Sequence, residues 1–359
     1  MKTAGKIKFL IPFCFLLIII TVMNSCKKND NSNNNNTIEQ SFSQVNLVAN
    51  SSSYAGARVD PNLINAWGIA FNPTGNAWIS STGSGVTVVY DKTGAQLLAP
   101  VAIPAAGAAN GGAITGQVFN GTADFILNNG NPAKFIFAGA DGIISGWNSG
   151  GSAERKINNS ANAAYTGLAL ATYGAVNYIY ASNFLAGTID VFDKNFAAVT
   201  MPFTDPNLPA GYSPFNVQNV GGLLYVMYAK ADEITHEEQK GPGLGYIDIY
   251  NHDGSFVKRF ASQGELNAPW GITQAPPNFL GNSTGEILIG NFGDGRINAF
   301  DNSGNFIKSL KSNGNIIQIA GLWAITFAPA TATTIDANWL FFTAGPNDEH
   351  DGLFGYIKK

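Results

Sequence analysis

The sequence predicts an all-β protein, a six-bladed β-propeller closed by an N-terminal strand. Three observations lead to this prediction. Charged residues make up only 12% of the chain, 41 residues are glycine, and no long stretch carries apolar residues at helical spacing. Short strand-like runs recur along the chain with a period of about 53 residues. The last repeat lacks a final strand, whereas an unassigned strand-like run precedes the first repeat.

The period is set by six runs that end on an aromatic residue followed by a turn. Four antiparallel strands at this spacing form one propeller blade. In the first repeat we expect strands over 66–71, 77–80, 86–90 and 96–101, and in the fifth over 270–274, 286–290, 296–300 and 306–310. The second repeat is the least regular, with strands expected over 124–128 and 134–138. The six aromatic residues are Tyr90, Trp147, Phe192, Tyr250, Phe300 and Tyr356.

Closure of the ring requires a strand from the N-terminal side. The third strand of the sixth repeat, Leu353 to Ile357, is followed only by Lys358 and Lys359, so no fourth strand can follow it. Its backbone groups would remain unpaired. The segment from Phe42 to Ala49 alternates apolar and polar residues and belongs to no other hairpin. We therefore predict that it pairs with Leu353 to Ile357 as the outer strand of blade six.

One repeat carries a family resemblance. The stretch from Leu266 to Leu310 contains Pro269-Trp270-Gly271-Ile272, then Gly285-Glu286-Ile287-Leu288-Ile289, and then Arg296-Ile297 followed by Phe300-Asp301 and Gly304. It is similar to an NHL repeat. The whole chain resembles a family of exported bacterial propellers whose function is uncharacterised. The resemblance implies a propeller fold and an extracytoplasmic location.

The N-terminal region is typical of a bacterial lipoprotein precursor. Three lysines precede an apolar run from Phe9 to Val22, which is shorter than the roughly 20 residues of a membrane-spanning helix. The run ends in Met23-Asn24-Ser25-Cys26, which resembles a lipoprotein processing site. We expect residues 1–25 to be a signal peptide, Cys26 to carry the lipid, residues 26–41 to be a flexible polar tether, and residues 42–359 to form the propeller.

Charge excludes one class of partner. Removal of residues 1–25 leaves 17 basic and 24 acidic side chains, a net charge of −7. A chain with this excess of acidic groups is not expected to bind nucleic acid. We expect a monomer that reaches the membrane only through the lipid anchor.

Two loops between the second and third strands of their blades concentrate charge in a chain that is otherwise poor in it. These are Ala229 to Gly245 in blade four and Gly345 to Gly352 in blade six. Equivalent loops of a propeller share one face, so an acidic sector is expected there with its side chains exposed. It would bind a cation or a basic or polyhydroxylated ligand, or it would only keep the protein soluble. The candidate residues are Asp232, Glu233, Glu237, Asp294, Asp348 and Asp351.

A metal site is the sharper alternative. Calcium-dependent propeller lactonases bind their metal near the axis with Glu, Asn and Asp, and Asn183, Asn216 and Asn291 are candidates for such ligands here. No glutamate precedes the inner strand of blade one, where those enzymes have one. Three tryptophans at the starts of inner strands would either stack on a sugar or pack between blades. They are Trp67, Trp270 and Trp323.

Two functions follow from these features. The first is a lipid-anchored extracytoplasmic propeller that binds a protein or a glycan, with no cofactor and no catalytic residue. The alternative is a Ca²⁺-dependent hydrolase or lyase with its site at the axial end of the propeller. Propellers host both kinds of function, so the fold does not decide between them.

Overall fold

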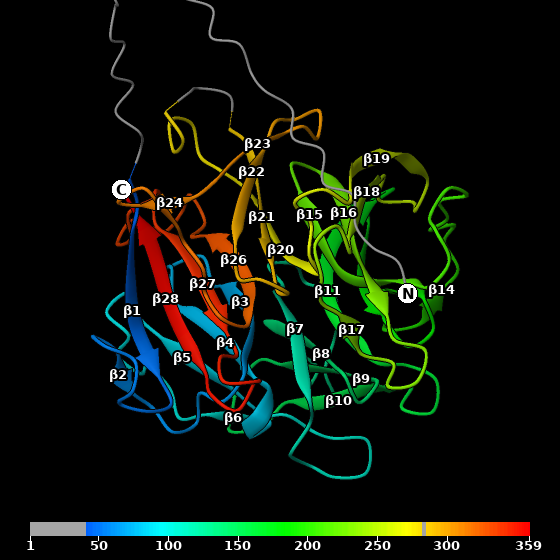
Figure 1. The fold of residues 1–359 in the computed structure, drawn as a ribbon. Coiled ribbons are helices and arrows are strands. Elements are labelled where there is room, and N and C mark those ends of the chain that lie inside the picture. The colour runs from blue at the N-terminus through cyan, green and yellow to red at the C-terminus, as the bar shows by residue number, and fades with distance from the viewer. Residues whose placement is uncertain (1–40, 282–284) are drawn as a thin grey trace, which may run out of the picture. The chain divides into compact units, whose positions relative to one another are not determined.

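The computed structural model of the chain describes residues 41–281 and 285–359, which form six sheets, the blades, around a central axis, together with one separate hairpin (Figure 1). The predicted all-β, six-bladed propeller is confirmed. The predicted signal peptide, the anchor at Cys26 and the tether up to residue 40 lie outside the described residues. Within the described ranges, no helix is long and apolar enough to cross a membrane.

Blades one to three follow one another along the chain, each with four strands in sequence order. Blade one contains β3 (Ala66–Phe71), β4 (Ala77–Ser81), β5 (Val86–Tyr90) and β6 (Val101–Ala102). Blade two contains β7 (Ile114–Phe119), β8 (Phe135–Gly139), β9 (Ile143–Trp147) and β10 (Glu154–Asn158). Blade three contains β11 (Tyr165–Tyr173), β12 (Val176–Asn183), β13 (Thr188–Asp193) and β14 (Ala198–Val199).

Additional short strands occur in blade four and between blades five and six. Blade four contains β15 (Tyr212–Val220), β16 (Leu223–Ala231), β18 (Tyr246–Tyr250) and β19 (Phe256–Ser262), and β17 (Glu238–Gln239) also pairs with β16. Blade five contains β20 (Pro269–Gln274), β21 (Ile287–Asn291), β22 (Ile297–Phe300) and β23 (Phe306–Ser309). Blade six contains β26 (Leu322–Phe327), β27 (Leu340–Ala344) and β28 (Leu353–Lys358), and β24 (Lys311–Ser312) with β25 (Asn315–Ile316) forms a separate hairpin before it.

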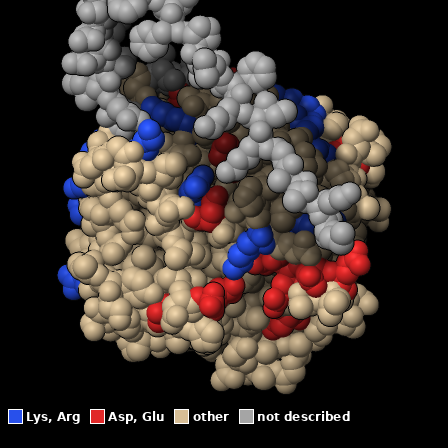
Figure 2. All heavy atoms as spheres, in the orientation of Figure 1, with Lys and Arg blue, Asp and Glu red and all other residues tan. Residues whose placement is uncertain are grey.

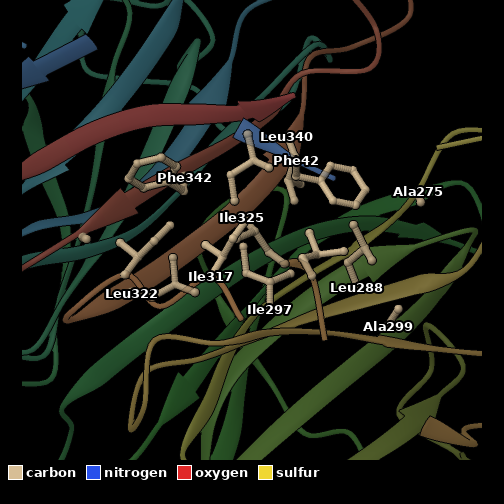
Figure 3. Close-up of a cluster of buried hydrophobic side chains, with 14 of the residues drawn as sticks. Phe42, Ala275, Leu288, Ile297, Ala299, Ile317, Leu322, Ile325, Leu340 and Phe342 are labelled. Carbon is tan, nitrogen blue, oxygen red and sulfur yellow. The ribbon is translucent and has the colours of Figure 1, made fainter. Parts of the chain in front are cut away.

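The N-terminal strand closes the ring as predicted. β1 (Ser43–Ala49) pairs antiparallel with β28, with Val45 opposite Tyr356 and Ala49 opposite Leu353. Just before β1, Phe42 is 1% exposed and lies in a buried cluster with Leu340 and Phe342 (Figure 3). The clasp is wider than predicted, because β2 (Arg58–Val59) pairs with β1 as a fifth strand.

The structure corrects the strands predicted for blade two. Residues 124–128 form no strand, and the inner strand is β7, ten residues earlier in the chain. The intervening loop is stabilised by Asn120, whose Nδ2 donates to the carbonyl oxygens of Asp124 and Ala133. Phe125 is fully buried but has a φ of 62°, which a strand does not allow. Burial of an apolar residue in a loop therefore produced the false strand pattern.

The turns between third and fourth strands use one repeated device. An aspartate Oδ1 accepts the backbone N–H groups two and four residues later, at 2.7 to 3.0 Å. This side-chain contact fixes a tight turn. Blade four has asparagine, Asn251, in the equivalent place. The aspartates are Asp91, Asp193 and Asp301.

Candidate functional site

A β-bulge interrupts every inner strand near its start. A bulge places two residues opposite one and redirects the side chain of the extra residue. The inner strands also approach closely: a Cβ on Gly68 would overlap the carbonyl oxygen of Thr115, and one on Gly167 would overlap the side chain of Asn216. The bulges begin at Trp67, Thr115, Thr166, Phe215, Trp270 and Trp323.

Aromatic rings from these bulges fill the centre of the propeller. Trp67 stacks on Trp323 with ring centroids 3.6 Å apart, and Phe292 lies 3.8 Å from Trp323. Trp270 meets Trp323 edge to face at 6.0 Å. The three tryptophans are at most 7% exposed. Of the two alternatives for them, packing between blades is the one that the structure shows. We call this cluster of Trp67, Phe215, Trp270, Phe292 and Trp323 the axial plug.

Hydrogen bonds fix the plug in place. Trp270 Nε1 donates to the carbonyl oxygen of Thr166 at 2.9 Å, across the ring from blade five to blade three. Trp323 Nε1 donates to Asn65 Oδ1 at 2.8 Å. The bulges of blades two and three begin at threonines, Thr115 and Thr166, whose small side chains leave room for these large indoles. The plug is therefore a rigid floor beneath the face that carries the loops between second and third strands.

The loops of blades four and six meet above this floor. Lys240 Nζ lies 4.2 Å from the ring centroid of Phe292, a favourable contact between a cation and an aromatic ring. Asn65 Nδ2 donates to Glu349 Oε2 at 2.7 Å. A chain of hydrogen bonds thus runs from Glu349 through Asn65 to Trp323. It connects the surface of the loop-bearing face with the axial plug.

Two glutamates at this meeting point lie in a poorly solvated environment. Burial raises the pKa of Glu238 to about 7, and the charge of Glu349 adds to the increase. Burial also raises the pKa of Glu349, while the hydrogen bond from Asn65 and the charge of Lys240 oppose the increase. The charge of Glu349 therefore makes ionisation of Glu238 less favourable, and the charges of Glu237 and Asp348 have the same effect on Glu349.

The backbone of the blade six loop is strained at the same place. Asn347, Asp348 and Glu349 have φ values of 57°, 47° and 65°, so three successive residues adopt the left-handed conformation. Each such residue other than glycine costs about 1 kcal/mol. This left-handed backbone places the Glu349 carboxylate against Asn65 and leaves the Asp348 side chain exposed.

Three of the six predicted acidic residues have structural contacts. Asp232 Oδ1 accepts the N–H groups of Ile234 and Thr235, and Asp294 Oδ1 accepts the N–H of Arg296. Asp351 accepts from Asn50 Nδ2 and from the Tyr54 hydroxyl, both at 2.9 Å. The six side chains were expected to be exposed, whereas residues Asp232, Asp294 and Asp351 are half-buried and their carboxylates accept these hydrogen bonds.

The other three, Glu233, Glu237 and Asp348, are exposed, and their carboxylates make no hydrogen bond or ion pair among the described residues. Figure 2 shows acidic side chains gathered on one face, in the part of the view that β17 and its neighbouring loops occupy in Figure 1. We call these three residues the acidic rim. Lys240, in the same loop as Glu233 and Glu237, lies above the plug.

The three candidate metal ligands do not form a common site. Asn183 bonds with Ala164, Asn162 and Asp190 of blade three, and Asn216 bonds with Val217 and with the carbonyl oxygen of Trp270. Asn291 Nδ2 donates to the carbonyl oxygen of Glu265. All three are at most 3% exposed. Across residues 41–281 and 285–359, no group of three His, Cys, Asp or Glu side chains has a geometry suited to a metal ion.

Comparison with known proteins places the chain among viral relatives. No protein-family model matches it. Uncharacterized protein R648 of Acanthamoeba polyphaga mimivirus is 34% identical over 334 residues, which cover 88% of this chain and 80% of the relative. Uncharacterized protein L690 of the same virus is 33% identical over 333 residues, covering 88% and 86%. The chain belongs to the family of these mimivirus proteins.

Solved structures support the fold at low sequence identity. The GH93 α-L-arabinofuranosidase of Fusarium graminearum aligns with a TM-score of 0.54 and 10% identity, over 89% of this chain and 98% of that one. Virginiamycin B lyase from Staphylococcus aureus aligns with a TM-score of 0.51 and 14% identity, over 89% and 99%. Both likenesses show the shared fold. The bacterial family, the NHL resemblance and the lipid anchor stay predictions from the sequence.

Proposed function

We propose that this protein is a binding module of a cell envelope, in which the loop-bearing face of the propeller docks a protein or a glycan. The observation that carries the proposal is the acidic rim: three exposed carboxylates without partners lie on loops that meet above a rigid aromatic floor. Carboxylates in this state are free to accept hydrogen bonds from ammonium, guanidinium or sugar hydroxyl groups.

The geometry favours surface docking over catalysis in the axial channel. On this face the plug fills the axis, so a ligand meets the loops and not a deep cavity. The three asparagines considered as metal ligands are buried, and each donates its side-chain N–H to another group of the protein. A preformed surface with free polar groups on rigidly based loops suits recognition.

The lipid anchor is the second part of the proposal. It rests on Met23-Asn24-Ser25-Cys26 after an apolar run too short to span a bilayer, and on the polar residues that follow. A lipid on Cys26 and a tether over residues 26–41 would hold the propeller at the membrane surface. The binding proposal does not depend on this anchor.

Binding arrays test the docking proposal. Residues 39–359 would be screened on arrays of basic peptides and of neutral oligosaccharides, and each hit would be titrated. The test variant replaces Glu233 and Glu237 with glutamine and Asp348 with asparagine, and we expect it to bind at least tenfold more weakly, because charge-assisted hydrogen bonds contribute about 1.5 kcal/mol or more each.

A matched control removes the same charge from the opposite face. It replaces Asp91, Asp193 and Asp301 with asparagine, whose side-chain oxygen can accept the same backbone N–H groups of the turn. We expect this control to bind like the wild type. Equal loss of affinity in both triple variants would show that net charge alone, and not the acidic rim, attracts the ligand.

A further inference from the structure

Blade three has an incomplete outer edge. Its third strand, β13, has six residues, but its outer strand, β14, has only two and pairs with Val191 and Phe192 alone. Thr188, Ile189 and Asp190 therefore have no outer strand neighbour among the described residues. The outer strands of blades two, four and five have five, seven and four residues, and that of blade one, β6, also has two but is supplemented by a bridge between Gln96 and Tyr90.

A proline limits how far β14 can extend along the edge. Pro202 lies three residues after Val199 and lacks the N–H that a sheet ladder needs. The chain leaves the edge at this point and leads toward blade four, where Met201 and Phe203 pack against the apolar cluster that contains Val191. The part of β13 nearest the loop-bearing face is left uncovered.

A cavity of about 400 Å³ borders the uncovered edge. Residues 188–192 of β13 line one side, and the segment from Ala198 to Thr204 lines the other. An exposed strand edge beside open space is a template for an additional strand. Extended peptides bind other proteins in this way through backbone hydrogen bonds.

We propose that the open edge of blade three binds an extended peptide segment of a partner protein by β-strand addition. This site is separate from the acidic rim and does not depend on the function proposed for it. The added strand would continue the pairing that β14 begins and would lie opposite Thr188, Ile189 and Asp190.

The existing register specifies the side chains of the partner. Because Val191 pairs with Val199, the next positions of an added strand lie opposite Asp190 and then Ile189. Asp190 lines the cavity; its Oδ2 accepts from the Tyr165 hydroxyl at 2.9 Å and from Asn183 Nδ2 at 3.1 Å, and its Oδ1 accepts from Thr188 Oγ1 at 2.9 Å. Cross-strand neighbours of opposite charge stabilise a sheet, so a basic residue fits opposite Asp190.

The neighbouring position requires an apolar residue. Ile189 is 8% exposed, and it belongs to the same apolar cluster as Met201 and Phe203. An apolar side chain opposite Ile189 would extend this cluster. The partner segment is therefore an extended stretch in which basic and apolar residues alternate.

The test uses a fluorescent, capped pentapeptide of alternating lysine and valine, with the whole propeller of residues 39–359. We expect saturable binding by fluorescence anisotropy and slower hydrogen exchange at residues 188–190. The same peptide methylated on every backbone nitrogen should not bind, because it has no N–H groups for the ladder. Asp190→Asn should weaken binding about fivefold, the upper end for a cross-strand charge pair, while the control Asp193→Asn on the same strand should not.

Two results would overturn the proposal. One is equal affinity for the N-methylated peptide, which would mean that side-chain charge alone holds the peptide. The other is loss of binding in the acidic-rim triple variant but not in Asp190→Asn, which would assign the peptide to the loop-bearing face. If Asp190→Asn unfolds, the exchange pattern of the wild type decides, since protection outside residues 188–190 contradicts the proposal.

Discussion

Replacement of Glu238 by glutamine tests the environment at the centre of the loop-bearing face. The pKa of Glu238 is raised from 4.5 to about 7, chiefly by burial. A carboxyl group with a raised pKa in the folded protein binds its proton more tightly when folded than when unfolded. The folded state therefore loses stability as the pH rises from about 4.5 to about 7.

The pKa difference sets the magnitude. At about 1.4 kcal/mol per pKa unit, the rise from 4.5 to about 7 corresponds to about 3 kcal/mol of unfolding free energy. Glutamine has nearly the same shape and carries no charge. We expect Glu238→Gln to match the wild type at pH 4.5 and to be more stable than it by up to about 3 kcal/mol at pH 8.

Urea unfolding of residues 39–359 at pH 4.5, 6, 7 and 8 would measure this difference. Glu233→Gln is the matched control, because Glu233 lies in the same loop but is exposed, and it should track the wild type at every pH. A constant difference between Glu238→Gln and the wild type across this pH range would refute the reasoning. It would mean that Glu238 is solvated and that the loops of blades four and six do not meet as described.

Three further predictions concern the clasp, the anchor and the strained loop. Phe42→Ala should lower the unfolding free energy by about 3 kcal/mol or more, because the ring is fully buried against Phe279. Removal of residues 1–50 should lower the melting temperature, whereas removal of residues 1–38 should not. Equal melting temperatures of the two truncated proteins would contradict the clasp. Cys26→Ser should move the protein from the membrane to the soluble fraction on cell fractionation, and unchanged association would dismiss the lipid anchor. Asp348→Gly should raise the unfolding free energy by about 1 kcal/mol, since glycine adopts the left-handed conformation without strain; a stability loss would show that Asp348 has a contact of its own.

The fold could be predicted from the sequence because the patterns that indicate its strands are local and recur in every blade. The aromatic that ends each third strand recurs at a regular spacing, and Phe42 to Ala49 was the one unassigned run that could pair with the last strand. Blade two failed because Phe125 is buried in a loop, and an apolar pattern alone cannot distinguish a buried loop from a strand.

The candidate site was predicted less completely. Sequence reasoning located the two charged loops but could not tell which carboxylates turn inward. Glu349 lies between Asp348 and His350 in the chain, and only the left-handed backbone of residues 347–349 brings it to Asn65. Glu238 and Glu349 were not among the predicted site residues. The one sequence signal for them was their place in charged loops of a chain poor in charge.

The six bulges had no usable sequence signal either. Their residues include both tryptophan and threonine, and their common feature is a backbone register that becomes visible only when the strands are paired. The tryptophans were noticed in the sequence, but their role in the axial plug depends on this register. Side-chain type alone left sugar stacking and packing between blades as open alternatives.

A hydrogen-exchange footprint of the ligand selected on the arrays would test the central claim most directly. Residues 39–359 would be compared with and without the saturating ligand. Docking on the loop-bearing face predicts slower exchange in residues 229–245 and 345–352, with the turns at Asp91, Asp193 and Asp301 unchanged. Protection confined to those turns, on the opposite face, would contradict the proposed function.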